Sequence, residues 1–216
     1  MAFQPADPNG EVNRRRHHLP HWDQAKTTMF VAFRFGDSVP QQKLQHWNEE
    51  RVHWLTYHGV TRAADIANLP EELRQEYHHR FTVRFHEWLD AGYGECLLRL
   101  PQVGQIVANA LRHFHGTRYA IESFVIMPNH VHALFTPVVG MKSSDILHTW
   151  KSYTVHAINS KLERKGELWQ KESYNRLVRD EVEFHHYRHY IWTNPTRAKL
   201  QDRDFIWWDA LGVPSS

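Results

Sequence analysis

The stretch Tyr119–Thr136, YAIESFVIMPNHVHALFT, contains two runs of β-branched and aromatic residues separated by a short break. Residues 119–126 and residues 130–136 each have the composition and length of a strand. Met127-Pro128-Asn129 between them has the chemistry of a turn, because proline and asparagine favour turn conformations. The sequence therefore predicts an antiparallel hairpin at this point, and the elements on either side are placed relative to it.

Segments before and after this hairpin extend the pattern. Residues 102–114 carry apolar side chains at i, i+3 and i+4, which is typical of a helix that lies on a sheet. Residues 27–34 are β-branched and aromatic and predict a buried first strand. Beyond the hairpin the patterns predict a helix that starts at Ser143 or Ser144, a strand or irregular edge at 169–178, and a last helix from the capping box of Asp180 and Glu183 to Asn194-Pro195.

This order of elements predicts the fold class. A strand, a helix, two strands, a helix and a strand form the split β-α-β arrangement, so we expect an α+β, ferredoxin-like antiparallel sheet with helices on one face. A polar, helical pattern at 41–92 predicts an insertion after the first strand. The predicted domains are a basic N-terminal arm at 1–22, a single catalytic domain at 23–200 and a C-terminal tail at 201–216.

Length and composition favour one globular domain. The 216 residues are 41% hydrophobic and 13% aromatic, too rich in core-forming side chains for a disordered chain. No apolar run is long enough to span a membrane, and the N-terminus MAFQPADPNG has no apolar signal core. The single cysteine, Cys96, cannot form an intramolecular disulfide. We therefore expect a cytoplasmic protein that is not associated with a membrane.

The second predicted strand carries a pair of histidines. His130 and His132 are two residues apart, so in a strand they point to the same face and can present two imidazoles to one metal ion. Val131, Ala133 and Phe135 alternate with them and would form the apolar face. Because the chain has 18 histidines, a His-x-His pair also arises by chance, and the spacing alone leaves open a packed, purely structural pair.

The last helix offers a hydroxyl and an amide on one face. Tyr190 and Asn194 are an i, i+4 pair beside the apolar stripe of Phe184, Tyr187 and Ile191. Taken alone, Tyr190 is an amphipathic packing residue and Asn194 a helix cap. Taken with the histidines, they indicate a phosphoryl-transfer site, because a metal held by two imidazoles and one amide keeps open positions for phosphate oxygens.

Several segments resemble the REP-associated tyrosine transposases, relatives of the single-tyrosine transposases within the His-hydrophobe-His (HUH) endonuclease superfamily. The resemblance is most specific in VIMPNHVHALF at 125–135 and YIWTNP at 190–195. Further similar segments, which extend the resemblance over most of the chain from Arg14 to Leu200, are RHHLPHW at 16–22, FVAFR at 30–34 and LWQKESY at 168–174.

The resemblance implies a function. It implies the HUH endonuclease fold, cleavage and rejoining of single-stranded DNA at palindromic repeat hairpins, and a divalent Mg²⁺ or Mn²⁺ ion. His130 and His132 match the two histidine ligands, and Tyr190 matches the nucleophile that forms a 5′-phosphotyrosine. Asn194 stands where related transposases present a longer glutamine as third ligand. Since the covalent intermediate stores the phosphodiester bond, no nucleotide cofactor is expected, and the protein would act as a monomer or a homodimer.

Other residues remain candidates. Tyr187 is the main rival nucleophile, although it falls on the predicted core stripe, and Tyr153 and Tyr174 are further rivals. Basic side chains can bind a nucleic-acid backbone without reading its sequence. The predicted DNA-binding residues are Arg14, Arg15 and Arg16 in the N-terminal arm, and Lys151, Lys171, Arg176 and Arg179 between the histidines and the tyrosine helix.

Two other classes of function stay open. A ferredoxin-like sheet also serves RNA recognition, so a repeat-DNA or RNA binding protein that does not cleave is an alternative. The intact set of His130, His132 and Tyr190 argues against it. A zinc hydrolase built on the His-x-His pair is less favoured, because no third His, Asp or Glu stands at a recognisable ligand spacing.

Overall fold

The computed structural model describes residues 3–5, 13–16, 20–23 and 26–213, with the backbone alone described for 13–16 and 20–23. The chain forms two compact units. The first consists of Met1–Gly36 and Leu97–Ser216, and the second of Asp37–Cys96. The predicted catalytic residues all belong to the first unit.

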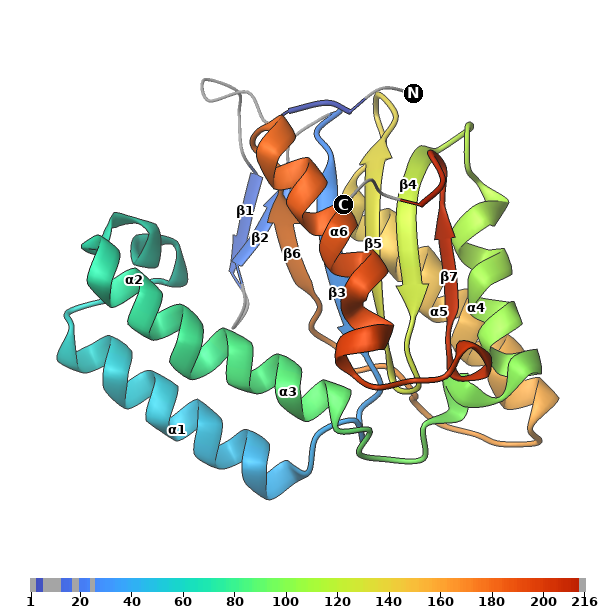
Figure 1. Cartoon of the computed structure of the whole chain (residues 1–216), viewed down its shortest axis with the longest axis horizontal. Coiled ribbons are helices and arrows are strands. Elements are labelled where there is room, and N and C mark those ends of the chain that lie inside the picture. The colour runs from blue at the N-terminus through green and yellow to red at the C-terminus, as the bar shows by residue number, and fades with distance from the viewer. Residues whose placement is uncertain (1–2, 6–12, 17–19, 24–25, 214–216) are drawn as a thin grey trace. The chain divides into compact units, whose positions relative to one another are not determined.

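A five-stranded antiparallel sheet forms the centre of the first unit (Figure 1). Its order, β6-β3-β5-β4-β7, places β5 between β3 and β4, which is the split β-α-β arrangement. The predicted fold class is therefore confirmed. The strands are β3 (Met29–Arg34), β4 (Tyr119–Ile126), β5 (His130–Pro137), β6 (Tyr174–Leu177) and β7 (Ile206–Asp209).

Helices cover both faces of this sheet, whereas the sequence analysis expected them on one face. The helices α4 (Pro101–His113) and α5 (Ser143–Lys161) lie on one side, and α6 (Glu181–Arg197) lies on the other (Figure 1). The correction has a physical reason: all eight residues of β5 are buried, and a strand buried on both faces needs a layer on each.

The alternation along β5 explains which layer each helix joins. Val131, Ala133 and Phe135 pack in one core cluster with residues of α4 and α5. Leu134, on the same face as the two histidines, packs in a second cluster with Phe184 of α6. The tyrosine helix therefore covers the histidine face of the sheet.

The two ends of the chain add strands outside the predicted core. In the N-terminal arm, β1 (Asn13–Arg16) pairs with β2 (Pro20–Asp23), and β2 lies beside β6. The predicted C-terminal tail is not a simple tail, because β7 within it pairs with β4 as an edge strand. Ile206, Trp207 and Trp208 favour this extended conformation, since β-branched and aromatic residues fit a half-buried sheet position.

The second unit is helical, as the pattern at 41–92 predicted. Trp54 and Phe81 form part of its own core, with ring centroids 6.0 Å apart. Its elements are α1 (Gln41–Tyr57), the 3-10 helix η1 (Ala63–Asn68), α2 (Glu71–Tyr77), the π-helix η2 (His78–Val83) and α3 (Arg84–Asp90). Short 3-10 helices η3 (Leu97–Arg99) and η4 (Asp202–Asp204) belong to the first unit.

Candidate active site

The two histidines of β5 lie side by side on the face that α6 covers. His130 and His132 are each 1% exposed, and their ring centroids are 4.8 Å apart with the rings almost perpendicular. In the sheet, His130 is the cross-strand partner of Arg34, and His132 is the partner of Ala32. The pair thus occupies two adjacent rows of the sheet, where both imidazoles can reach one ligand.

Asn129 orients the first of these rings. Nδ1 of His130 lies 2.7 Å from Oδ1 of Asn129, which is fully buried. Because an amide oxygen only accepts hydrogen bonds, Nδ1 is the donor and Nε2 carries the lone pair. Histidines that bind metals typically have a neighbouring residue that fixes the tautomer of the ring in this way. The sequence analysis assigned Asn129 only to the turn.

Tyr190 of α6 meets the second histidine. The ring centroids of Tyr190 and His132 are 5.2 Å apart with an angle of 82° between the rings, an edge-to-face contact. The Tyr190 ring also stands edge-on to Phe30, at 5.9 Å. Tyr190 is only partly buried, so a substrate can approach it. The structure therefore brings together Tyr190 and the histidine pair that the sequence singled out.

Asn194 is fully buried, and neither polar atom of its side chain has a hydrogen-bond partner among the described residues. The helix α6 runs antiparallel to β5, so the end of α6 lies toward the start of β5 (Figure 1). Residues i and i+4 of a helix are about 6 Å apart along its axis. Residues i and i+2 of a strand are about 6.8 Å apart, which is a similar distance. The helix and strand repeats therefore match, and since Tyr190 contacts His132, we expect Asn194 to lie near His130.

These residues fit a divalent cation. A buried amide without partners costs free energy unless a ligand satisfies it, and an amide oxygen with two imidazole nitrogens is a suitable donor set. Among the described residues, no group of three His, Cys, Asp or Glu side chains could hold a metal ion. The Asn194 oxygen could supply a third protein ligand to a site at the histidine pair.

The rival Tyr187 is a packing residue. Its ring stacks on Phe30 with centroids 4.2 Å apart and an angle of 16°. Burial, and then the neighbouring Tyr174, raises the pKa of Tyr187 above its ordinary value. A phenol that is buried in this way is a poor nucleophile, because burial disfavours its phenolate form. Of the other rivals, Tyr153 is exposed on α5, which covers the opposite face of the sheet.

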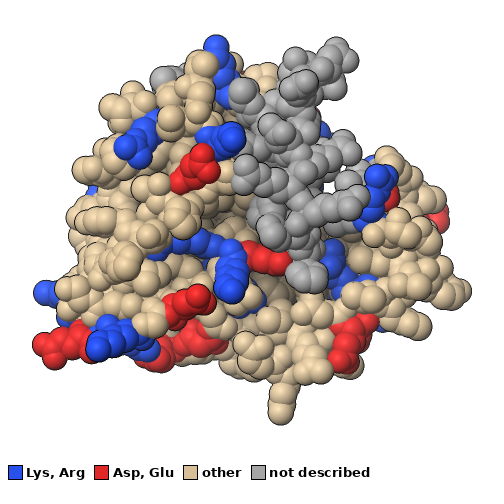
Figure 2. All heavy atoms as spheres, turned by 180° about the vertical axis from the view of Figure 1, so that it is seen from behind, with Lys and Arg blue, Asp and Glu red and all other residues tan. Residues whose placement is uncertain are grey.

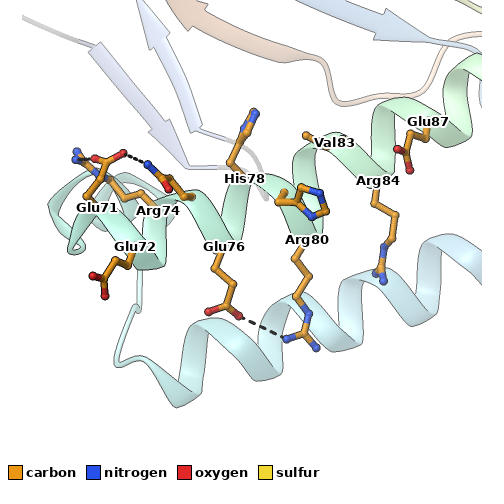
Figure 3. A pocket seen from close by; sticks show the side chains of 11 residues that line it. Glu71, Glu72, Arg74, Glu76, His78, Arg80, Val83, Arg84 and Glu87 are labelled. Atoms are coloured by element: carbon orange, nitrogen blue, oxygen red, sulfur yellow. Dashed lines mark hydrogen bonds and ion pairs between the residues drawn. The ribbon is translucent and has the colours of Figure 1, made fainter. Parts of the chain in front are cut away.

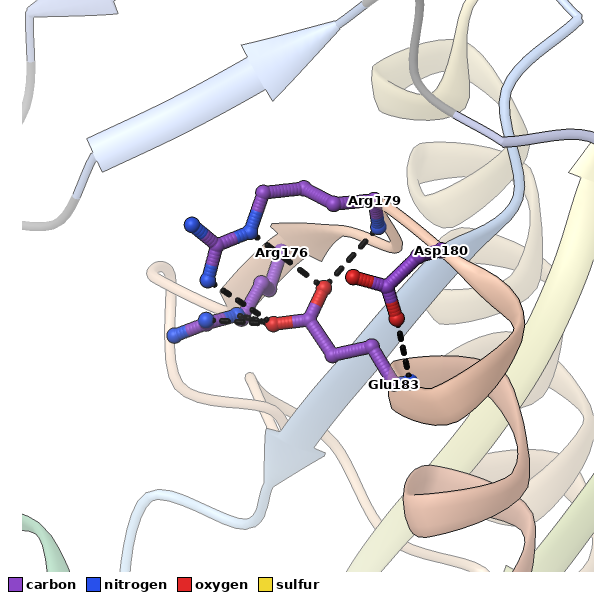
Figure 4. Close-up of polar contacts among 4 residues, drawn as sticks. All are labelled: Arg176, Arg179, Asp180 and Glu183. Atoms are coloured by element: carbon purple, nitrogen blue, oxygen red, sulfur yellow. Dashed lines mark hydrogen bonds and ion pairs between the residues drawn. The ribbon is translucent and has the colours of Figure 1, made fainter.

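The predicted cations Arg176 and Arg179 converge on one carboxylate at the start of α6 (Figure 4). Nη2 of Arg176 and Nη2 of Arg179 lie 2.5 Å and 3.0 Å from Oε1 of Glu183. The Glu183 backbone N–H in turn donates to Asp180, which caps the helix as predicted, but the capping box is incomplete because the Glu183 carboxylate accepts from the Arg179 backbone N–H instead. One carboxylate therefore balances only half of the charge of the two arginines.

The predicted cation Lys151 is also engaged. Its Nζ donates to the backbone carbonyls of Gln170 and Lys171, at 2.8 Å and 3.0 Å. Burial, and then the charge of Arg34, lowers the pKa of Lys151 to about 8. Lys151 therefore ties α5 to the segment before β6, whereas the Lys171 side chain is exposed. The side chains of Arg14, Arg15 and Arg16 lie outside the described part of the structure.

Three arginines near the site were not predicted. Arg34, 8% exposed, is the cross-strand neighbour of His130. Arg188 forms a buried, bidentate pair with Asp209, at 2.6 and 2.7 Å, which joins α6 to β7. The guanidinium of Arg197 lies over the Tyr190 ring, 5.6 Å from its centroid. The sequence analysis also missed Arg197, because it ended the helix at Asn194-Pro195, whereas α6 extends to Arg197.

Among the described residues, the other surfaces offer no comparable set of groups. On the described part of the face seen in Figure 2, Lys and Arg are interspersed with Asp and Glu. A hollow of about 1160 Å³ lies on α2, η2 and α3 in the second unit (Figure 3). Its charges pair with each other, as in Glu71 with Arg74 and, at 3.7 Å, Glu76 with Arg80. Such a lining does not favour a ligand of one sign.

Comparisons with known proteins found one family model and one solved structure that are similar to this chain. Residues 101–194 match the protein-family model described as "Transposase IS200 like", and this range contains both histidines, Tyr190 and Asn194. The match covers less than half of the chain, and within it the chain is similar to IS200-like transposases. Among curated proteins, none matches significantly. A solved structure of a REP-associated tyrosine transposase bound to a REP hairpin is similar, with 13% identity and a TM-score of 0.44, over 86% of this chain and 73% of that one. No helix in the described residues is long and apolar enough to cross a membrane.

Proposed function

We propose that this chain, whose residues 101–194 are similar to IS200-like transposases, cleaves and rejoins single-stranded DNA at palindromic repeat hairpins through a covalent bond to Tyr190. The observation that carries the proposal is the contact between Tyr190 and His132, with the buried amide of Asn194 one helical turn away. A hydroxyl beside a set of metal-binding groups is what phosphoryl transfer requires.

In this proposal His130, His132 and Asn194 hold a Mg²⁺ or Mn²⁺ ion. When bound, such an ion neutralises charge on the scissile phosphate and orients it. Asn129 keeps Nε2 of His130 available, and the packing of Phe30 and α6 excludes water from one side of the pair. The protein thereby prepares its ligands before the DNA arrives, which reduces the reorganisation that catalysis needs.

The reaction is a transesterification. Oη of Tyr190 attacks the scissile phosphorus, the bond from phosphorus to the 3′-oxygen breaks, and the proton lost by the phenol is balanced by the one gained at the 3′-oxygen. The products are a 5′-phosphotyrosine and a free 3′-hydroxyl. A 3′-hydroxyl can reverse the step and join strands, so no nucleotide cofactor is consumed.

One copy of the chain supplies the complete set of groups in this proposal. Tyr190 and the histidines meet within a single chain because α6 packs on β4 and β5 of its own sheet. A monomer can therefore perform the chemistry, and a homodimer would hold two sites.

Backbone contacts to DNA come from the basic side chains around the site. Lys171 is exposed and so is available to a phosphate, and Arg179 is exposed although it pairs with Glu183. The ribbon of β1 and β2, which carries Arg14, Arg15 and Arg16, lies beside β6. Binding through such residues would be strongly salt-dependent.

Cleavage of single-stranded oligonucleotides from repeats of the protein's own genome tests this function. In the presence of Mn²⁺ the wild type should give a 3′-hydroxyl product and a product linked to protein. Tyr190→Phe should give neither, whereas the matched variant Tyr153→Phe, on the opposite side of the sheet, should retain both. Binding of a repeat hairpin without any cleavage by the wild type would support the non-cleaving alternative.

A further inference from the structure

Arg197, the last residue of α6, shares a helix face with Tyr190 and Asn194. The three stand at i, i+4 and i+7, and seven residues make almost two helical turns, so they form one stripe along the helix. Side chains of a helix point back toward its N-terminus, which lets the long Arg197 side chain reach Tyr190. Its guanidinium carbon lies 5.6 Å from the centroid of the Tyr190 ring.

The helix continues far enough to allow this contact. The sequence analysis ended it at Asn194-Pro195, but α6 includes Pro195 and extends to Arg197. The Ala198 backbone N–H donates to the carbonyl of Asn194 at 3.0 Å, so the last turn stays helical beyond the proline. If the helix ended at Asn194, Arg197 would not be held on the face of Tyr190.

The charge of Arg197 differs from that of the neighbouring cations. Arg176 and Arg179 share Glu183, and Arg188 pairs with Asp209. No described acidic side chain forms an ion pair with Arg197, and its residue is exposed. A guanidinium presents a planar fork of N–H donors that matches phosphate oxygens. Arg197 is thus placed beside the nucleophile with its charge available to an anion.

We propose that Arg197 is a catalytic residue that binds a non-bridging oxygen of the phosphate attacked by Tyr190. The proposal rests on the proposed function and adds a protein cation to the phosphate-binding groups. It also gives the cation–π contact a role, because the contact holds the guanidinium over the ring until the phosphate arrives. The simpler explanation is that Arg197 only stabilises the negative end of the helix dipole.

A substitution in the protein combined with a substitution in the DNA separates these explanations. Adduct formation is measured in single turnover for the wild type, Arg197→Gln and Arg197→Lys, on an oligonucleotide with an ordinary scissile phosphodiester and on one with a neutral methylphosphonate there. Arg203→Gln removes an exposed arginine elsewhere in the same unit and is the matched control. Hairpin affinity and melting temperature are measured in parallel.

If Arg197 binds the phosphate, Arg197→Gln lowers the rate on the phosphodiester by about 10²-fold, the size expected for removing one donor to a developing anion. On the methylphosphonate the same change has little effect, and Arg197→Lys restores part of the rate. An equal loss on both substrates, or an unchanged rate, would overturn the proposal. A wild type that forms no adduct on either substrate would instead overturn the proposed function, and this proposal with it.

Discussion

The ring of Tyr190 stands edge-on to the ring of His132, with the two centroids 5.2 Å apart. The contact joins α6 to the central strand β5 on the sheet face where the two histidines stand beside the second apolar cluster. Tyr190 keeps this position because two other residues of α6 are buried, Phe184 before it and Ile191 directly after it. The helix is thus held by apolar packing while its tyrosine faces the histidines.

The buried amide of Asn194 should matter for metal binding and not for folding. Asn194→Leu replaces an unpartnered amide by an apolar group of similar shape, so the free energy of unfolding without metal should stay the same or increase. Affinity for Mn²⁺, measured by calorimetry, should fall sharply in the same variant. Tight Mn²⁺ binding by Asn194→Leu would show that the amide is not a ligand.

Asn129 should tune the site through His130. Asn129→Ala removes the hydrogen bond to Nδ1, and the loss of such an orienting partner typically lowers metal affinity about 10–100-fold. Competition with a metal indicator measures the change. The His130→Ala variant sets the lower limit of metal affinity. An Asn129→Ala protein with wild-type affinity would show that Asn129 does not support the metal site.

The pair of Arg188 and Asp209 should hold the tyrosine helix on the sheet. Removing one partner leaves the other charge buried, so Arg188→Leu should lower the free energy of unfolding by about 3–5 kcal/mol in urea denaturation. The double variant Arg188→Leu/Asp209→Leu leaves neither charge unpaired and should recover much of this loss. Equal stabilities of the single and double variants would show that the pair is not coupled.

Glu122 should make stability depend on pH. Burial in β4, and also the charge of Asp209, raises its pKa above the ordinary value. The folded state therefore binds this proton more tightly than the unfolded state, and the contribution to stability falls as pH rises from the unfolded to the folded pKa. Glu122→Gln, which resembles the protonated form, should match the wild type at low pH and become the more stable protein at higher pH.

Urea denaturation across this pH range measures the difference. Glu72→Gln, which alters an exposed carboxyl, is the matched control. A difference between Glu122→Gln and the wild type that stays constant with pH would contradict a raised pKa at Glu122.

The elements of the fold could be predicted where side-chain periodicity reports burial. The strands at Tyr119–Ile126 and His130–Pro137 agree closely with the predicted hairpin, because proline and asparagine mark the turn between two apolar runs. Placing α6 on the second face needed the sheet order, which alternation in one strand does not give. β7 was missed because its four residues are too short a run to show a period.

The site could be predicted in part, again because side-chain periodicity shows which residues share a face. His130 and His132 follow the strand period, and Tyr190 and Asn194 follow the helix period, so the groups on each element were evident. Which cations remain available was not evident, because Arg176 and Glu183 come from different elements and meet only in the folded chain. The role of Asn129 was also not evident. Asparagine is a common turn residue, so its position between two strands was fully explained by the turn.

The most direct test of the central claim is to locate the covalent DNA bond in the wild-type protein. Trypsin cuts after Arg179, Arg188 and Arg197, so Tyr187 and Tyr190 fall in the separate peptides 180–188 and 189–197. Mass spectrometry of the protein trapped on a cleaved repeat oligonucleotide should find the nucleotide on the peptide 189–197, at Tyr190. Nucleotide attached to the peptide 180–188, at Tyr187, would contradict the account.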